Sequence, residues 1–156
     1  MRDKLFKQNY ELLKKIAPDM LEGEIKDYYL IHEFNDHVNQ CMVIERVEKN
    51  VLSVGTFFTM NGDRVCDPDM WILFDNKLGL ARIHSFTLDT AAWSMLGAAI
   101  HYNCDCYFSD FDRPMIEAER SAEEKEYNDY LLLYLKELAD RIKQNSNLWE
   151  KVMADY

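Results

Sequence analysis

The stretch that decides the fold runs from Cys41 to Asp63 and reads CMVIERVEKNVLSVGTFFTMNGD. Apolar and β-branched residues are frequent on both sides of the polar break Glu48-Lys49-Asn50, and the period of two is typical of neighbouring strands. The stretch ends in Asn61-Gly62-Asp63, where Asn and Gly tolerate the positive φ angles of a tight turn. Because connections this short join adjacent strands, the stretch predicts an antiparallel hairpin.

The same pattern extends in both directions along the chain. A strand is expected over 28–32, and two more are expected over 70–74 and 80–87, with a turn at 75–77 between them. Together these segments predict an antiparallel meander of four to six strands. The segment 88–115 is ambiguous: residues 90–96 fit a short helix or a bent strand, and residues 98–108 fit a strand better.

Amphipathic helices are expected on either side of the meander. Apolar residues recur at helical spacing from Leu5 to Ile16, and Pro18 is expected to end that helix. A longer helix is expected to start near Ile116 or Ser121 and to reach Ile142, followed by a terminal turn around 148–149. The predicted fold is one α+β domain over 1–156, with an N-terminal helix, an antiparallel β-meander and a long C-terminal helix packed on the sheet.

Composition and charge narrow the class of protein. The chain has 156 residues, of which 48% are hydrophobic, and its formal net charge is -10 with a pI near 4.8. A hydrophobic fraction this high argues against disorder, and the acidity disfavours direct binding to nucleic acid or to an acidic membrane. The same acidity favours a basic protein partner. The start of the sequence lacks the apolar region of a secretory signal, so we expect a cytoplasmic protein.

Three short motifs, in order, resemble a known family. They read NYELLKKIAP at 9–18, PDMWILFD at 68–75 and EKEYNDYL at 124–131. Together they resemble the YqiB-like family of small bacterial proteins, a domain of unknown function, and its relatives on mobile elements. The segment from Phe86 to Met115 departs from the family pattern. The resemblance implies the same fold class and a cellular location, and it implies no mechanism.

The densest charge lies between Asp105 and Asp129. This segment holds nine acidic and three basic residues, a net charge of -6. Carboxylates three or four positions apart on a helix lie about 5 to 6 Å from each other, so such a row can imitate a phosphate backbone. The simpler interpretation is a solvated helix face with acids near its N-terminus. The candidate partner-binding residues are Asp110, Asp112, Glu117, Glu119, Glu123, Glu124 and Glu126.

A second candidate cluster lies at the entry to the strand predicted over 70–74. It consists of Asp63, Asp67 and Asp69 with Trp71, and carboxylate oxygens are the ligands that Mg²⁺ and Ca²⁺ prefer. The cluster predicts, as an alternative function, a metal-dependent phosphodiesterase. The simpler interpretation is a solvated hairpin in which Pro68 fixes the start of the strand.

A third hypothesis is a small-molecule site on an aromatic-lined sheet, which would appear as a deep apolar pocket. Its candidate residues are Tyr28, Phe57, Trp71 and Trp93. The sequence has no glycine-rich phosphate loop and no nucleophile with a base nearby in sequence. We therefore favour a non-enzymatic interaction or accessory protein that binds or inhibits a basic, nucleic-acid-handling partner, and we expect no cofactor and no resident metal.

Overall fold

The computed structural model describes residues 2–22, 27–35, 38–60, 62–89, 100–103, 122–144 and 149–153. The helices are α1 (Arg2–Ile16), α2 (Pro18–Glu22) and α3 (Ala122–Gln144). The strands are β1 (Asp27–Asn35), β2 (Val38–Glu48), β3 (Val51–Met60), β4 (Asp63–Asp75), β5 (Leu80–Leu88), β6 (Ile100–Asn103) and β7 (Trp149–Met153).

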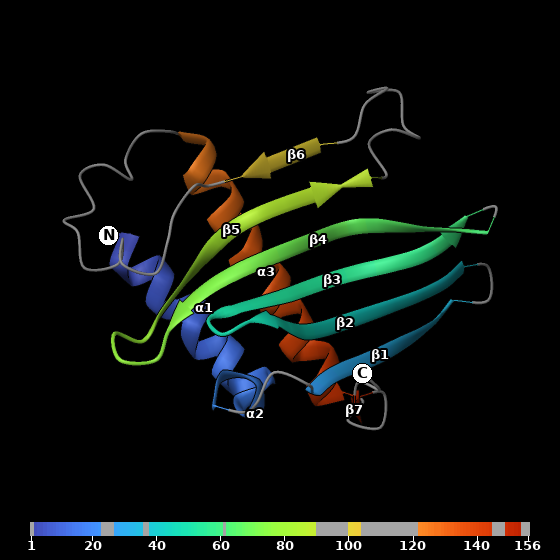
Figure 1. Ribbon diagram of the computed structural model, residues 1–156, viewed down its shortest axis with the longest axis horizontal. Helices are drawn as coiled ribbons and strands as arrows, with labels where there is room; N and C mark the ends of the chain where they lie inside the picture. The colour runs from blue at the N-terminus through green and yellow to red at the C-terminus, as the bar shows by residue number, and fades with distance from the viewer. Residues whose placement is uncertain are drawn as a thin grey trace.

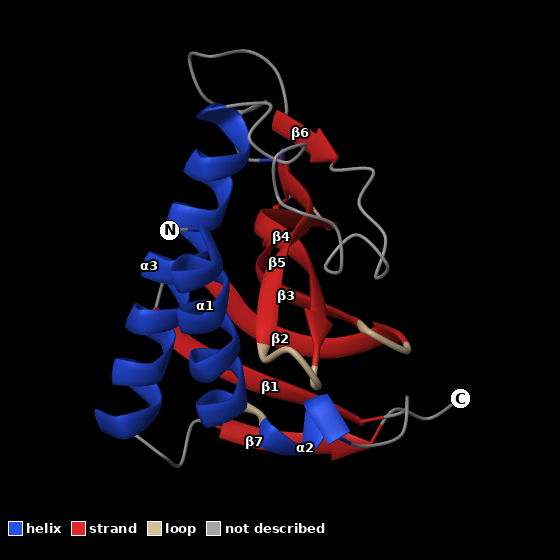
Figure 2. Cartoon of the chain, turned by 90° about the vertical axis from the view of Figure 1, so that its left-hand side faces the viewer, coloured by secondary structure: helices blue, strands red, loops and turns tan. Residues whose placement is uncertain are grey.

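The sheet is antiparallel throughout and has the order β6-β5-β4-β3-β2-β1-β7. Strands β1 to β5 follow one another in chain order and form a five-stranded meander (Figure 1). Helices α1 and α3 lie side by side on one face of this sheet, as the side view in Figure 2 shows. The predicted α+β fold, with an N-terminal helix, a meander and a C-terminal helix on the sheet, is confirmed.

The core lies between these two helices and the sheet. Alternate residues of the central strands point toward the helices, among them Ile44, Leu52 and Ile72, each at most 1% exposed. Leu131 and Leu135 of α3 are fully buried against the same layer. A smaller cluster, made of Phe6, Val51, Leu73 and Leu80, adds to the core near the start of α1.

Turn chemistry explains how the strands connect. Gly62 and Gly79 adopt φ angles of +84° and +65°, which residues with a Cβ rarely adopt. The carboxylate of Asp75 accepts hydrogen bonds from the backbone N–H groups of Lys77 at 2.8 Å and Leu78 at 3.1 Å, and so stabilises the turn between β4 and β5. The turns predicted at 61–63 and 75–77 therefore match the hairpins observed.

Two segments differ from the prediction. Strand β4 begins at Asp63 and pairs with β3, so the expected hairpin is present, but Pro68 lies inside the strand rather than at its start. Trp149, which was expected in a terminal turn, begins strand β7 instead, and this strand pairs with β1 from Trp149 to Met153. The helix considered for 90–96 lies outside the described residues, and within the strand expected over 98–108 the described residues form β6.

Neither α1 nor α3 combines the length and the apolar character that crossing a bilayer requires, and α2 is far too short.

Candidate functional site

A pocket of about 240 Å³ opens where one flank of α3 meets strands β2, β3 and β4. Helix α3 supplies most of its polar groups and the strands supply the rest. The lining residues are Met42, Thr56, Asp67, Tyr130, Tyr134, Glu137, Leu138 and Arg141.

The helical wall of the pocket is formed by residues that are three or four positions apart along α3. Tyr130, Tyr134, Glu137 and Arg141 are separated by four, three and four residues, so they form one stripe along the helix. This stripe borders the buried stripe that includes Leu135, and it therefore lies at the edge of the core rather than inside it.

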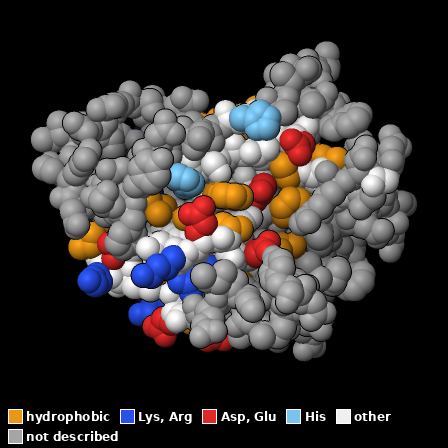
Figure 3. All heavy atoms as spheres, viewed as in Figure 1, with side chains coloured by type: hydrophobic (Ala, Val, Ile, Leu, Met, Phe, Trp, Pro, Cys, Tyr) orange, Lys and Arg blue, Asp and Glu red, His pale blue; other side chains and the backbone are white. Residues whose placement is uncertain are grey.

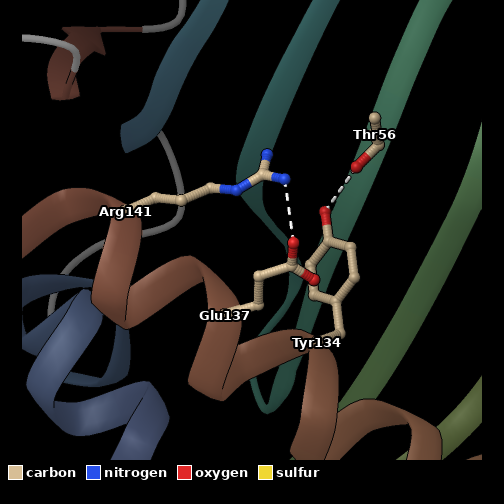
Figure 4. Close-up of polar contacts among 4 residues, drawn as sticks. All are labelled: Thr56, Tyr134, Glu137 and Arg141. Atoms are coloured by element: carbon tan, nitrogen blue, oxygen red, sulfur yellow. Dashed lines mark hydrogen bonds and ion pairs between the residues drawn. The ribbon is translucent and has the colours of Figure 1, made fainter.

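Two side-chain hydrogen bonds, one buried and one part-buried, join α3 to the sheet. The side-chain oxygen of Asn128 accepts a 2.9 Å hydrogen bond from the backbone N–H of Ile83 in β5. One and a half turns further on, the hydroxyls of Tyr134 and Thr56 of β3 are 2.6 Å apart and hydrogen-bonded (Figure 4). Buried polar groups are costly to leave unpaired, so these two contacts specify how the helix lies on the sheet.

The strand side of the pocket depends on a β-bulge. Gly55 pairs with Asp69 and Phe57 pairs with Cys66, so Asp67 and Pro68 together oppose the single residue Thr56. An extra residue reverses the alternation of side chains along a strand. As a result Asp67 lines the pocket on the helix-covered face.

Asp69, by contrast, faces away from the helices. Its Oδ1 accepts a 2.7 Å hydrogen bond from Ser53, whose neighbours Leu52 and Val54 point into the core. This outer face of the sheet is seen in Figure 3, where acidic, histidine and hydrophobic side chains lie close together. The bulge therefore places Asp67 and Asp69 on opposite faces.

The phenol of Tyr134 is held neutral. Burial raises its pKa well above the ordinary value of 10.0, and the hydrogen bond with Thr56 offsets only part of that effect. Tyr134 therefore contributes a hydroxyl and a ring to the wall of the pocket, and it supplies no charge at physiological pH.

The mouth of the pocket is charged and exposed. Arg141 Nη2 lies 2.8 Å from Glu137 Oε1, and the side chains of Arg141 and Glu137 are 44% and 64% exposed (Figure 4). An exposed pair four residues apart on a helix contributes only about 0.3 to 0.5 kcal/mol to the free energy of unfolding.

Tyr130 lines the same pocket as the carboxylates of Asp67 and Glu137. Its ring is packed edge-on against Phe86, with centroids 5.4 Å apart, while the residue stays 43% exposed. Its pKa is raised by burial first, and then by the negative charges of Asp67 and Glu137. Both carboxylates therefore act on the same phenol, and negative potential converges at the mouth of the pocket.

The acidic segment predicted to bind a partner is described only in part. Asp110, Asp112, Glu117 and Glu119 lie outside the described residues. Glu123, Glu124 and Glu126 belong to the first turns of α3, and Glu126 is exposed. Their helical position agrees with the expected spacing, and their role stays a prediction.

The second predicted cluster is divided among several environments. Asp67 lines the pocket, Asp69 bonds Ser53 on the outer face, and Trp71 packs against the smaller apolar cluster. Asp63 begins β4, and its side chain is outside the described part. Among the side chains that are described, no group of three His, Cys, Asp or Glu residues lies close enough to hold a metal ion.

Cysteine chemistry is disfavoured at the one buried thiol that is described. The Sγ atom of Cys66 donates to Asp89 Oδ2 at 3.0 Å, and burial together with that carboxylate raises the thiol pKa to about 11. The thiol therefore stays protonated and is a poor nucleophile at physiological pH.

In comparisons with known proteins, the sequence matches no family model, no curated protein and no solved structure. The resemblance to the YqiB-like family therefore stays a prediction, and the function has to be argued from the pocket itself.

Sequence reasoning missed most of the pocket. The sequence predicts the helix that carries Tyr130, Tyr134, Glu137 and Arg141, but none of these four residues is among the predicted site residues. The available signal was the spacing of four, three and four, which combines two phenols with an ion pair along one flank of the helix. Thr56 and Asp67 carry no such signal, because a bulge determines which way Asp67 points.

Proposed function

We propose that the protein is a non-enzymatic binding protein for a basic protein partner, and that one cationic side chain of the partner enters the pocket on the flank of α3. The observation that carries this proposal is the convergence of Asp67 and Glu137 on Tyr130. The two carboxylates come from different elements, and the ring beside them is partly exposed.

The charge of the chain supports a basic partner. The sequence has 28 acidic and 18 basic residues. A negative surface accelerates encounter with a positive partner and repels nucleic acid. The acidic residues at the start of α3, including Glu126, continue the same charge beyond the pocket, and the segment from Asp110 to Glu119 is proposed to extend it further.

The size and polarity of the pocket favour a side chain over a cofactor or drug-sized ligand. Sites for such ligands usually measure about 300 to 1,000 Å³ and are mostly apolar. The pocket of about 240 Å³ is smaller and carries three charged side chains. Exposed Tyr130 and Leu133, which are 43% and 66% exposed, supply apolar contact area beside the mouth.

Binding to a defined peptide tests the proposal. A fluorescent peptide in which arginine and lysine alternate with glycine is titrated with the protein, and its anisotropy is recorded. The negative control is the same peptide with citrulline in place of arginine and acetyl-lysine in place of lysine. We expect saturable binding of the basic peptide that weakens as salt is added, because exposed charges are screened.

The matched variants separate the pocket from overall acidity. Asp67→Asn with Glu137→Gln removes two carboxylates from the pocket, and Glu11→Gln with Glu48→Gln removes two exposed carboxylates elsewhere. The first pair should lose most of the binding and the second pair should keep it. Equal losses, or equal binding of the neutral peptide, would refute the proposal.

A further inference from the structure

Two exposed apolar side chains lie next to each other on α3. Leu133 is 66% exposed, and Tyr130, three residues earlier, is 43% exposed. Within the described part of the chain, the third exposed large apolar side chain is Leu78, which lies in the turn between β4 and β5. A single exposed leucine is common on a protein surface, but an adjacent apolar pair on one helix marks a place where another molecule can make contact.

The pair belongs to a regular stripe along the outer side of α3, here called the outer seam. Its members are separated by four, three, four and three residues, which is the spacing of the contact positions in a coiled coil. All of them are exposed, while the buried residues of α3 lie on the opposite side, in the core. The outer seam therefore faces away from the rest of the domain. It consists of Glu126, Tyr130, Leu133, Glu137 and Asp140.

The outer seam is apolar in its middle and acidic at both ends. Glu126 and Asp140 each lie seven residues, or about two turns, from Leu133. Among the described residues, neither Glu126 nor Asp140 has a partner in an ion pair or a side-chain hydrogen bond, whereas Glu137 is bound to Arg141. An apolar centre with a charged rim is the usual composition of a protein interface.

A second copy of α3 does not fit the outer seam. If two copies packed in parallel, Glu126 would lie against Glu126 and Asp140 against Asp140. If they packed antiparallel about the apolar pair, Glu126 would lie against an acidic residue at the other end of the seam. Like charges meet in both arrangements, and such pairs are destabilising. The charges therefore select a different helix, one with cations at both ends.

We infer that the outer seam docks an amphipathic helix of the partner, whose contact stripe is apolar in the middle and carries lysine or arginine at both ends. The inference rests on the proposed function, because it names the form in which the basic partner meets α3. Helices with this contact spacing cross at about 20°, so the partner helix would run nearly along α3. Tyr130 and Glu137 belong to both the outer seam and the pocket lining, so the docked helix would lie beside the mouth of the pocket.

Two capped synthetic peptides of equal composition serve as probes, each three heptads long. The helical probe has leucine at the contact positions of its middle heptad, lysine at those of its outer heptads, and alanine and glutamine elsewhere. In the scrambled probe, the leucines no longer share one helical face. Calorimetry measures the binding of each probe to the full-length chain, and far-ultraviolet circular dichroism measures the helix that forms on binding. Unfolding temperatures verify that every variant is folded.

The apolar centre of the outer seam is tested by Leu133→Gln. Leu78→Gln is the matched control, since it makes the same exchange at an exposed leucine of another element. We expect Leu133→Gln to bind the helical probe roughly tenfold to thirtyfold more weakly than Leu78→Gln does, because docking buries most of the Leu133 side chain.

The acidic ends of the outer seam are tested by the double variant Glu126→Lys with Asp140→Lys. The control, Glu11→Lys with Glu48→Lys, changes the net charge equally at exposed positions of α1 and β2. The first variant should bind the helical probe roughly threefold to tenfold more weakly than the control does. It should also bind a probe with glutamate in place of the lysines more tightly than the wild type does.

Four results would overturn the inference. Equal binding of the helical and scrambled probes would show that no helix is recognised. Equal affinities of Leu133→Gln and Leu78→Gln for the helical probe would place the contact elsewhere. Equal losses in the two charge variants would show only a long-range effect of charge. A wild-type dimer in sedimentation that Leu133→Gln dissociates would show that a second copy occupies the outer seam.

The outcomes also separate this inference from the proposed function. If the flexible peptide of arginine, lysine and glycine binds through the pocket while the helical probe binds no better than the scrambled one, the inference fails and the proposed function stands. If the helical probe binds through Leu133 while the flexible peptide does not bind, the proposed pocket contact fails and docking on the outer seam stands.

Discussion

The hydrogen bond between Tyr134 and Thr56 fixes α3 to β3, so its removal tests how the pocket is built. The two hydroxyl oxygens are 2.6 Å apart, and Thr56 is only 6% exposed. Tyr134→Phe leaves the Thr56 hydroxyl buried without this partner, and Thr56→Val leaves the phenol in the same state. Each single change should cost about 1.5 kcal/mol of unfolding free energy, since an unpaired buried hydroxyl costs about 1 to 3 kcal/mol.

The double variant should cost about as much as either single variant, because replacing both partners by apolar groups leaves nothing unpaired. The expected coupling energy is therefore about 1 to 1.5 kcal/mol. Urea unfolding followed by circular dichroism measures all four proteins. For a chain of this length, about 1.5 kcal/mol corresponds to a fall of about 3 to 6 °C in Tm. Tyr130→Phe, which removes the same atom from an exposed ring, should change stability by less than about 0.5 kcal/mol. Purely additive losses would refute the coupling between α3 and β3.

Three further predictions follow from the buried groups. Because the pKa of Tyr134 is raised in the folded protein, the unfolded chain releases its phenolic proton first as the pH rises through 10.0. The free energy of unfolding should therefore fall above that pH, and Tyr134→Phe should reduce the fall. Urea unfolding at a series of pH values would contradict this if both proteins lost stability equally with pH. Cys66 has a thiol pKa of about 11 and should react with iodoacetamide far more slowly in the native protein than in urea. Mass spectrometry of the peptide that contains Cys66 measures both rates, and equal rates would contradict its burial. Leu135→Ala should lower the unfolding free energy by about 2 to 5 kcal/mol, because Leu135 is fully buried between α3 and the sheet, and a loss below 1 kcal/mol in urea unfolding would place it outside the core.

The strands and helices could be predicted because their signals are local. Alternation around Val51–Met60 and the turn residues at 61–63 reflect the pleat and the φ angles of the segment itself. The extension of β4 back to Asp63 could not be predicted this way. Aspartate and proline are depleted in strands, and here pairing with β3 prevails over that preference.

The pocket was harder to predict because it is assembled from distant parts of the chain. Thr56 and Tyr134 are 78 positions apart, and nothing near either residue indicates the other. The face of the sheet on which Asp67 lies depends on the bulge opposite Thr56. This bulge shifts the alternation of side chains between the two faces by one residue. Strand β7 was missed for a similar reason, because it pairs with β1 at the opposite end of the sequence.

The measurement that tests the central claim most directly is the mapping of a basic peptide on the protein by NMR chemical shifts. The account predicts that the largest shifts on binding occur at Tyr130, Tyr134, Glu137 and Arg141 of α3 and at Asp67 of β4. Signals from the exposed side of α1, such as those of Lys7 and Glu11, should stay in place. Shifts centred on another face, or shifts that the acetylated and citrulline-containing peptide produces equally well, would contradict the account.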